Sequence, residues 1–129
     1  MSELTPYLAV RDAKAAVAWY VEHLGAVVTY DPIVMDDGRI GHVELTLDGA
    51  RWMMADEYPE IHVEAPPPGR GSAVTLHLSV PAPDLVDSCV ASAVQGGALL
   101  DREPEDGFAG RVAVFQDPFG HRWLVNHSA

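Results

Sequence analysis

The second half of this chain repeats the pattern of the first half, and this repeat constrains the fold more than any other feature. Each half opens with a short alternating stretch, YLAV at 7–10 and HLSV at 77–80, followed by a helix-like segment that ends in Gly-Ala. Each half also closes alike, with GARWMM at 49–54 and GHRWLV at 120–125. Because both pairs occur in the same order, we infer a duplication. The period exceeds the roughly 20–50 residues of solenoid repeats, so it predicts two modules of one domain.

Hydrophobic periodicity predicts the same order of elements in both halves. The first half has predicted strands over 4–10, 26–31, 40–47 and 50–55, and a helix that begins after Asp12 and ends at Gly25. The second half has predicted strands over 73–80, 98–101, 110–116 and 121–127, and a helix over 84–95. The predicted fold class is therefore α+β, with two βαβββ modules in tandem, 1–57 and 73–129. A stiff, proline-rich linker over 58–72 joins them within one domain, 1–129.

The composition narrows the classes of function. Of the 129 residues, 48% are hydrophobic and 21% are charged, which is enough for a buried core. Eight basic and nineteen acidic residues give a formal net charge of −11, which disfavours binding to nucleic acids and to anionic membranes. We find neither an apolar run of about 20 residues nor a signal peptide, so we expect a cytoplasmic location. The single cysteine, Cys89, excludes an internal disulfide and is expected on the apolar side of its helix.

Alternation along the strands predicts which side chains lie opposite the helices. Two interpretations of this second face stay open: the solvated side of an antiparallel sheet, or the lining of a cavity enclosed by a curved sheet. Its aromatic and apolar members favour the cavity, because a solvated face has little use for them. The predicted second face consists of Thr5, Tyr7, His42, Glu44, Thr46, Arg51, Met53, Thr75, His77, Ser79, Arg111, Phe115, Arg122 and Leu124.

Several segments resemble a known family over nearly the whole chain. They are PYLAVRDA at 6–13, WY at 19–20, LGA at 24–26, DGRI at 37–40, HVEL at 42–45, MADE at 54–57 and DPFGHRW at 117–123. Their pattern resembles the vicinal oxygen chelate superfamily, which includes glyoxalase I, bleomycin-resistance proteins and extradiol dioxygenases. Within it, the chain is most similar to small bacterial glyoxalase-like proteins of phosphonate-operon type. The resemblance implies paired βαβββ modules that form a cupped mixed sheet with helices on its outer face, and a homodimer.

The resemblance also implies where a metal ion would bind. In metal-dependent members, the first and last strands of each module offer His or Glu, and four such groups hold one divalent ion. The matching positions here are Thr5, Met53, Thr75 and Leu124, and none of these is a usual ligand for Zn²⁺, Ni²⁺ or Fe²⁺. We therefore expect no standard metal site and no cofactor.

A displaced metal site is an alternative. His42, Glu44 and His77 are predicted on one face, and two His with one carboxylate form a known ligand set. The other interpretation is that the three side chains hydrogen-bond a ligand or one another.

Two functions follow from these observations. In the first, a glyoxalase/bleomycin-resistance-like protein binds a small amphipathic or aromatic molecule in a cupped cavity, without the standard metal. In the second, a metal-dependent lyase, isomerase or dioxygenase uses the displaced site, with Glu44 as the proton acceptor. A purely structural interaction module would explain a dimer but not the polar face.

The sequence assigns residues to ligand binding but none to catalysis. Arginines on this face bind carboxylate or phosphate groups, or else pair with surface acids. A small-molecule ligand and a second copy of the chain are the expected partners. The predicted ligand-binding residues are Thr5, Tyr7, His42, Glu44, Met53, Thr75, His77, Arg111, Phe115, Arg122 and Leu124.

Overall fold

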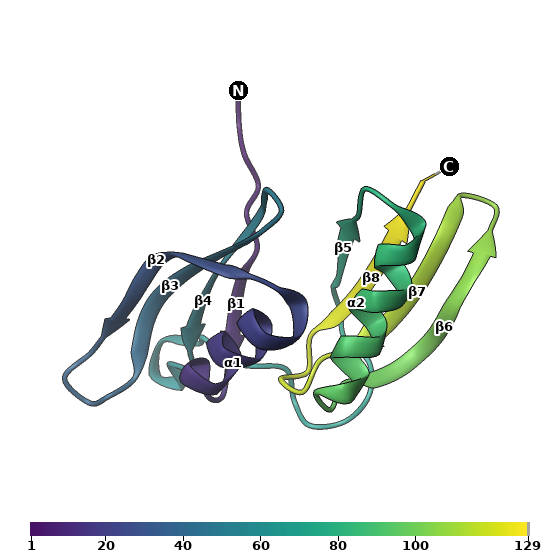
Figure 1. Ribbon diagram of the computed structural model, residues 1–129. Helices are drawn as coiled ribbons and strands as arrows, with labels where there is room; N and C mark the ends of the chain where they lie inside the picture. The colour runs from purple at the N-terminus through teal and green to yellow at the C-terminus, as the bar shows by residue number, and fades with distance from the viewer. Residues whose placement is uncertain (129) are drawn as a thin grey trace. The chain divides into compact units, whose positions relative to one another are not determined.

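The computed structural model describes residues 1–128, and the chain divides into two compact units, Met1–Pro66 and Pro67–Ala129. Each unit holds one four-stranded mixed sheet with a helix packed on one face (Figure 1). The predicted α+β fold with tandem βαβββ modules is confirmed. The boundary between the units falls within the segment 58–72 that the sequence predicts as a linker.

In unit 1, strand β1 and the chain's first helix come before an antiparallel meander. The elements are β1 (Tyr7–Val10), α1 (Ala13–Trp19), η1 (Tyr20–Leu24), β2 (Val27–Val34), β3 (Ile40–Leu47), β4 (Ala50–Asp56) and a short 3₁₀ turn, η2 (Pro59–Ile61). The strand order is β1-β4-β3-β2. Strand β1 is parallel to β4, with Tyr7 opposite Met53, and the other pairs are antiparallel.

Unit 2 repeats this arrangement. Its elements are β5 (Thr75–Ser79), α2 (Pro83–Gln95), β6 (Leu99–Gly107), β7 (Gly110–Gln116) and β8 (Arg122–His127), and its strand order is β5-β8-β7-β6. Strand β5 is parallel to β8, with His77 opposite Leu124. The pairs Tyr7–Met53 and His77–Leu124 therefore occupy the same place in the two sheets, as the repeat predicts.

The helix of unit 1 begins and ends at the predicted residues. The Asp12 side chain accepts a hydrogen bond from the Ala15 N–H at 3.0 Å, and Asp56 accepts one from the Ala13 N–H at 2.7 Å. Gly25, with φ of 76°, ends the helical segment in the left-handed conformation that glycine tolerates. The last turn, Tyr20–Leu24, is π-helical, which periodicity did not predict. It directs Tyr20, which is fully buried, edge-on against Trp52 at 5.4 Å.

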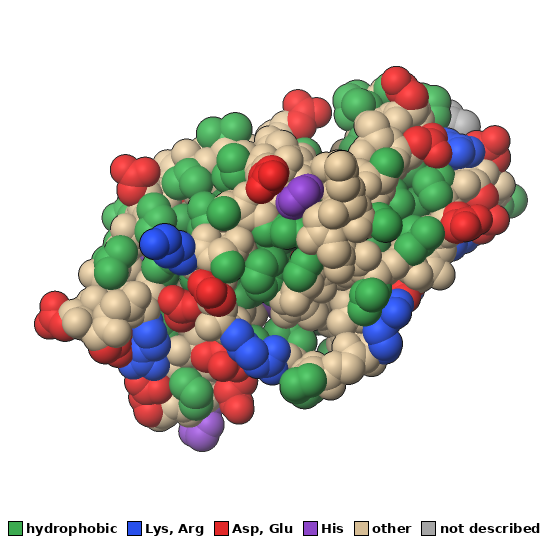
Figure 2. Space-filling model, turned by 60° about the horizontal axis from the view of Figure 1, so that its bottom comes forward, with side chains coloured by type: hydrophobic (Ala, Val, Ile, Leu, Met, Phe, Trp, Pro, Cys, Tyr) green, Lys and Arg blue, Asp and Glu red, His purple; other side chains and the backbone are tan. Residues whose placement is uncertain are grey.

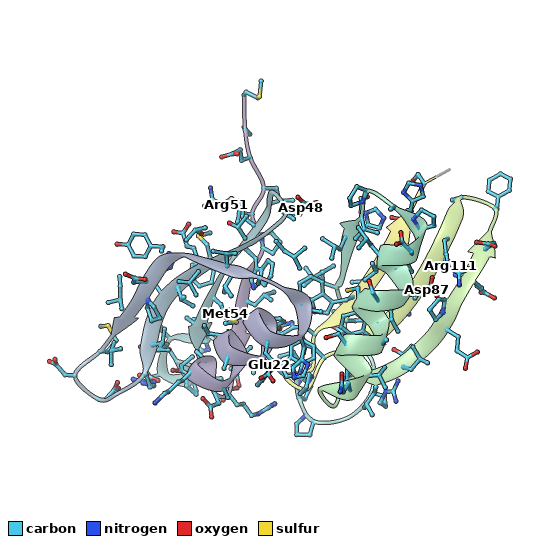
Figure 3. The ribbon with its side chains drawn as sticks, in the orientation of Figure 1. Glu22, Asp48, Arg51, Met54, Asp87 and Arg111 are labelled. Atoms are coloured by element: carbon cyan, nitrogen blue, oxygen red, sulfur yellow. The ribbon has the colours of Figure 1, made fainter. Side chains whose placement is uncertain are left out.

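Each core lies between the helix and one face of the sheet. In unit 1, Met54 on β4 is fully buried on the side that faces α1 (Figure 3). In unit 2, Val86 and Val90 of α2 are buried, and so are Phe115 and Trp123 of the sheet. Burying a side chain of this size stabilises a fold by about 1.5–3 kcal/mol. Cys89 lies on the same helix, and burial raises its pKa to about 11, so the thiol is protonated at neutral pH.

Four strand boundaries differ from the prediction by two or more residues. Strand β1 begins at Tyr7 rather than at 4, and β5 begins at Thr75 rather than at 73; Leu4 and Val74 are exposed and pack no helix. Strands β2 and β6 continue to Val34 and Gly107, past the predicted ends at 31 and 101. Both are edge strands with β-bulges, so their side chains show no regular alternation from which to predict an end.

The predicted placement of Arg111 and Phe115 on the second face is wrong. Phe115 pairs with Trp123 across β7 and β8, and their stacked rings lie 6.3 Å apart in the core of unit 2. Arg111 binds Asp87 of α2 through two hydrogen bonds of 2.8 Å (Figure 3). Both side chains therefore face the helix. The run from Val112 to Phe115 is apolar throughout, so alternation alone cannot choose its buried side, and an error of one residue reverses every side chain.

The DPFGHRW segment forms a turn held by one buried carboxylate. Asp117 accepts hydrogen bonds from the backbone N–H groups of Phe119 and His121, and from the Trp123 indole, at 2.9–3.0 Å. Its side chain thereby joins the turn to the core beneath α2. The motif that carries much of the family resemblance is structural in this chain.

Candidate functional site

A chain of four hydrogen-bonded side chains lies on the open face of unit 1, the face of the sheet opposite α1. The Tyr7 hydroxyl lies 2.7 Å from Nδ1 of His42, and Nε2 of His42 lies 2.8 Å from Oε2 of Glu44. Arg51 then donates from Nη2 to Oε1 of Glu44 at 3.1 Å. We call these residues, Tyr7, His42, Glu44 and Arg51, the polar chain. The sequence predicts all four on this face, and the structure joins them.

Strand register explains why the polar chain forms. His42 and Glu44 are two residues apart on β3, so both point to the same side of the sheet. Glu44 is opposite Met53 on β4, and Met53 is opposite Tyr7 on β1. The intervening Val43 and Leu45 are fully buried on the helix side. Three adjacent strands therefore each contribute to one polar row.

Burial and charge set the protonation of Tyr7. Partial burial, and next the negative charge of Glu44 and the nearby Tyr58, raise the pKa of Tyr7 above its ordinary value of 10. Tyr7 therefore remains a protonated hydroxyl at neutral pH and acts as a hydrogen-bond donor. Its side chain is about half exposed, so a bound molecule can reach it.

Aromatic and apolar side chains surround the polar chain. Tyr30 of β2 lies edge-on to the His42 ring, with centroids 5.5 Å apart, and Tyr7 contacts the same ring at 5.4 Å. Tyr30, Ile33 and Tyr7 are exposed by 43–50%. Strand alternation does not place Tyr30 on this face. A β-bulge between Val28 and Tyr30 shifts the register and turns Tyr30 to the open side.

A second cluster lies beside the start of β3. The guanidinium of Arg39 lies 3.9 Å from the centre of the Tyr58 ring and binds both Asp37 and Glu60. Hydrogen bonds from Arg39 lower the pKa of Glu60 to about 2. The Tyr58 hydroxyl is buried without a hydrogen-bond partner among the described residues, and a Cβ atom at position 41 would lie 3.5 Å from it.

A hollow of about 480 Å³ lies beside this cluster, but its charges are already paired. Arg39 is engaged as described above, Arg11 donates to the Pro66 carbonyl, and Asp56 accepts from two backbone N–H groups. The open face therefore suits a ligand better than the hollow does. The hollow is lined by Arg11, Asp12, Asp37, Gly38, Arg39, Asp56, Glu57 and Pro59.

The open face of unit 2 carries a different set. Arg122 donates to the Thr75 hydroxyl at 2.8 Å, and its Nε lies 3.7 Å from Asp101, which also pairs with Arg70. His77 and Thr75 are exposed on β5, and Leu124 is half-buried beside His77. The Gln116 side chain bonds the backbone of Gly69 and Gly71, which fastens that segment to the sheet.

On the face shown in Figure 2, charged groups are spread out rather than gathered in one patch. Figure 2 shows carboxylates scattered across the visible face, with the fewer basic side chains among them. Residues 1–128 contain no helix long and apolar enough to span a membrane.

The residues at the family's metal positions do not fit a metal ion. Thr5, Met53, Thr75 and Leu124 supply two hydroxyls, a thioether and a hydrocarbon, which are poor ligands for Zn²⁺, Ni²⁺ and Fe²⁺. In the described part of either unit, no three His, Cys, Asp or Glu side chains gather closely enough to hold an ion.

Comparison with known proteins agrees with this fold. The family model described as "Glyoxalase/Bleomycin resistance protein/Dioxygenase superfamily" matches residues 4–125. An uncharacterized protein of Mycobacterium bovis is 34% identical over 126 residues, covering 95% of this chain and 80% of its own length.

Solved structures share the fold at low sequence identity. A protein of Pseudomonas aeruginosa superposes with a TM-score of 0.77 at 21% identity, covering 99% of this chain and 98% of its own. A PhnB protein from Bacillus cereus gives a TM-score of 0.75 at 17% identity, covering 98% and 100%.

The tandem βαβββ units and their strand order define a glyoxalase-type fold. This chain belongs to the Glyoxalase/Bleomycin resistance protein/Dioxygenase superfamily, which the resemblance in its sequence predicts.

Proposed function

We propose that this protein binds a small amphipathic or aromatic molecule on the open face of unit 1, without the standard metal ion of the family. The polar chain carries the proposal. It presents the Arg51 guanidinium in a fixed position, next to the exposed rings of Tyr7 and Tyr30. A few oriented polar groups among apolar side chains are typical of small-molecule sites.

The polar chain is preorganised, which favours a binding site over a loose surface patch. Each member of the polar chain is held by the next, so a ligand does not have to order them. The two polar ends, Tyr7 and Arg51, suit an oxygen-bearing group of the ligand, and the neighbouring Met53 and Ile33 suit its apolar part.

The metal-dependent alternative is less well supported by the contacts of its ligands. Both ring nitrogens of His42 and both carboxylate oxygens of Glu44 already have hydrogen-bond partners. An ion at this place would have to displace Tyr7 or Arg51. His77 belongs to unit 2, where it is exposed on β5.

A thermal-shift screen tests the proposal. The panel contains bleomycin, aromatic carboxylates, phenols and neutral aromatic amides. We expect compounds from it to raise the melting temperature of the wild type and of Ser88→Ala, a control on the outer helix of unit 2. The same compounds should have little effect on His42→Ala. Absence of any stabilising compound, or equal effects on His42→Ala, contradicts the proposal.

Elemental analysis of the purified protein separates the two functions. We expect no stoichiometric Ni, Zn, Fe or Mn after purification without chelators. A tightly held ion that is lost in both His42→Ala and Glu44→Ala would establish the displaced site and favour a metal-dependent enzyme.

We also propose that the protein is a homodimer, as the family resemblance implies. Light scattering coupled to size-exclusion chromatography tests this directly. A mass equal to one chain at all concentrations would contradict it.

A further inference from the structure

The proton of the Tyr7 hydroxyl has two possible acceptors, which gives the polar chain two complete arrangements. The hydroxyl oxygen lies 2.7 Å from Nδ1 of His42 and 3.2 Å from the Gly41 carbonyl oxygen. When Tyr7 donates to Nδ1, His42 is neutral and its Nε2–H donates to Glu44. When Tyr7 donates to Gly41, a protonated His42 donates from Nδ1 to Tyr7 and from Nε2 to Glu44. His42 therefore takes up a proton without the loss of a hydrogen bond.

The charge of the polar chain changes between these arrangements. With neutral His42, the carboxylate of Glu44 and the guanidinium of Arg51 balance each other. With protonated His42, the face carries one net positive charge. Glu44 engages only Nη2 of Arg51, and the Arg51 side chain is 47% exposed, so Nε and Nη1 are free to donate to an anion.

We propose that this face binds small organic carboxylates that have an apolar body, and that binding adds one proton to His42. The inference rests on the proposed function and specifies its ligand class. The carboxylate accepts from Arg51 and lies near the protonated His42, while the apolar body packs on Met53, Tyr30 and Ile33. The anion favours the protonated imidazole by charge attraction, so each stabilises the other.

Among residues 1–128, no acid on another strand forms an ion pair with His42. Glu44 is the acidic group that contacts it, and Arg51 already balances that carboxylate. The titratable or charged groups that face it are Tyr7 from β1, Tyr30 from β2, Glu44 from β3 and, through Glu44, Arg51 from β4, with Tyr58 near Tyr7.

Benzoate and benzamide form the test pair, because they share a ring and differ in charge. Calorimetric titration in two buffers of different ionisation enthalpy measures the protons taken up on binding. At pH 7.5 to 8, we expect benzoate to bind about tenfold more tightly than benzamide and to take up a proton. Its affinity should rise as the pH falls, since binding is coupled to the uptake of a proton.

The protonation of His42 can be observed directly. Nitrogen-15 chemical shifts distinguish a ring with one proton from a ring with two. At fixed pH, saturating benzoate should convert His42 towards the doubly protonated ring, and benzamide should not.

Two variants isolate the polar chain. Tyr7→Phe removes the group that serves both arrangements, so proton uptake should disappear and benzoate affinity should fall. Arg51→Met should abolish the preference for benzoate over benzamide. Ser88→Ala, on α2 of unit 2, lies outside this face and serves as the control with benzoate affinity and proton uptake unchanged.

The outcomes separate this inference from the proposed function. If benzamide binds as well as benzoate, or benzoate binds without proton uptake, the carboxylate and proton inference is overturned while small-molecule binding stands. The same holds if only neutral compounds of the screening panel bind to this face. If no compound binds, both are overturned.

Discussion

The two open faces share one backbone register but carry different chemistry. Tyr7 and Met53 in unit 1 correspond to His77 and Leu124 in unit 2. The members of each pair are opposite each other on the two parallel strands of their sheet. Across the next strand, Glu44 is opposite Met53, whereas Val114 is opposite Leu124. The polar chain is therefore not required by the fold, since the same sheet forms in unit 2 with valine in place of Glu44.

The correspondence extends along both strands. His42 matches Val112, and Arg51 matches Arg122. Both arginines find a carboxylate, Glu44 in one unit and Asp101 in the other. A polar row in one copy and an apolar row in the other indicate that unit 1 holds the specialised surface.

The turns that precede the last strands also differ, and Asp117 is expected to give the largest effect on stability. Asp117→Ala leaves two part-buried N–H groups and the buried Trp123 indole without this acceptor, which should lower the free energy of unfolding by roughly 3–5 kcal/mol. Urea unfolding monitored by tryptophan fluorescence measures the loss. A loss below about 1 kcal/mol would mean that the carboxylate does not hold this turn.

A double substitution can give unit 1 the apolar row of unit 2. His42→Val with Glu44→Val gives unit 1 the residues found at the same positions of unit 2. We expect the double variant to remain folded, since unit 2 tolerates valines there, and to lose ligand affinity by about tenfold or more. Circular dichroism checks that the variant is folded, and titration with compounds from the screen measures its ligand affinity. Retained affinity would show that the polar chain is not part of the binding site.

The cluster around Arg39 makes the stability of unit 1 depend on pH. Because Arg39 lowers the pKa of Glu60 from 4.5 to about 2, this pair stabilises the fold fully above pH 4.5. Its contribution is lost as the pH falls through the folded value. Carbon-13 titration of Glu60 should show this low midpoint, and Arg39→Met should return the midpoint towards 4.5. An unchanged midpoint would assign the shift to another group.

The smallest effect is expected at the β3–β4 turn of unit 1. Asp48 has a positive φ of 48°, which glycine adopts with less strain. Asp48→Gly should therefore change the free energy of unfolding by no more than about 0.5 kcal/mol, in contrast with Asp117→Ala. Urea unfolding of both variants side by side makes the comparison. A large loss would show that Asp48 holds its turn as Asp117 does.

Most of the fold follows from the sequence because repetition and periodicity agree. The repeat aligned Tyr7 with His77 and Met53 with Leu124, and the strand pairs have that register. The buried strand β3 alternates cleanly, so its boundaries and both faces are as predicted. The edge strands β2 and β6 were predicted too short, since exposed and bulged strands leave no periodic signal.

The site was predicted in part. The four members of the polar chain were placed on one face, but their mutual hydrogen bonds depend on side-chain positions that alternation does not give. Phe115 was placed on the wrong face, although its pairing with Trp123 across a hairpin would have corrected this. Tyr30 was missed because a bulge reverses its direction.

The segment between the units is anchored at both ends. Arg11 holds the Pro66 carbonyl in unit 1, and Gln116 holds Gly69 and Gly71 in unit 2. Only Pro67 and Pro68 lie between these anchors, and the proline ring fixes φ in both. The duplicated halves are thus joined by a short segment with few backbone torsions free to rotate.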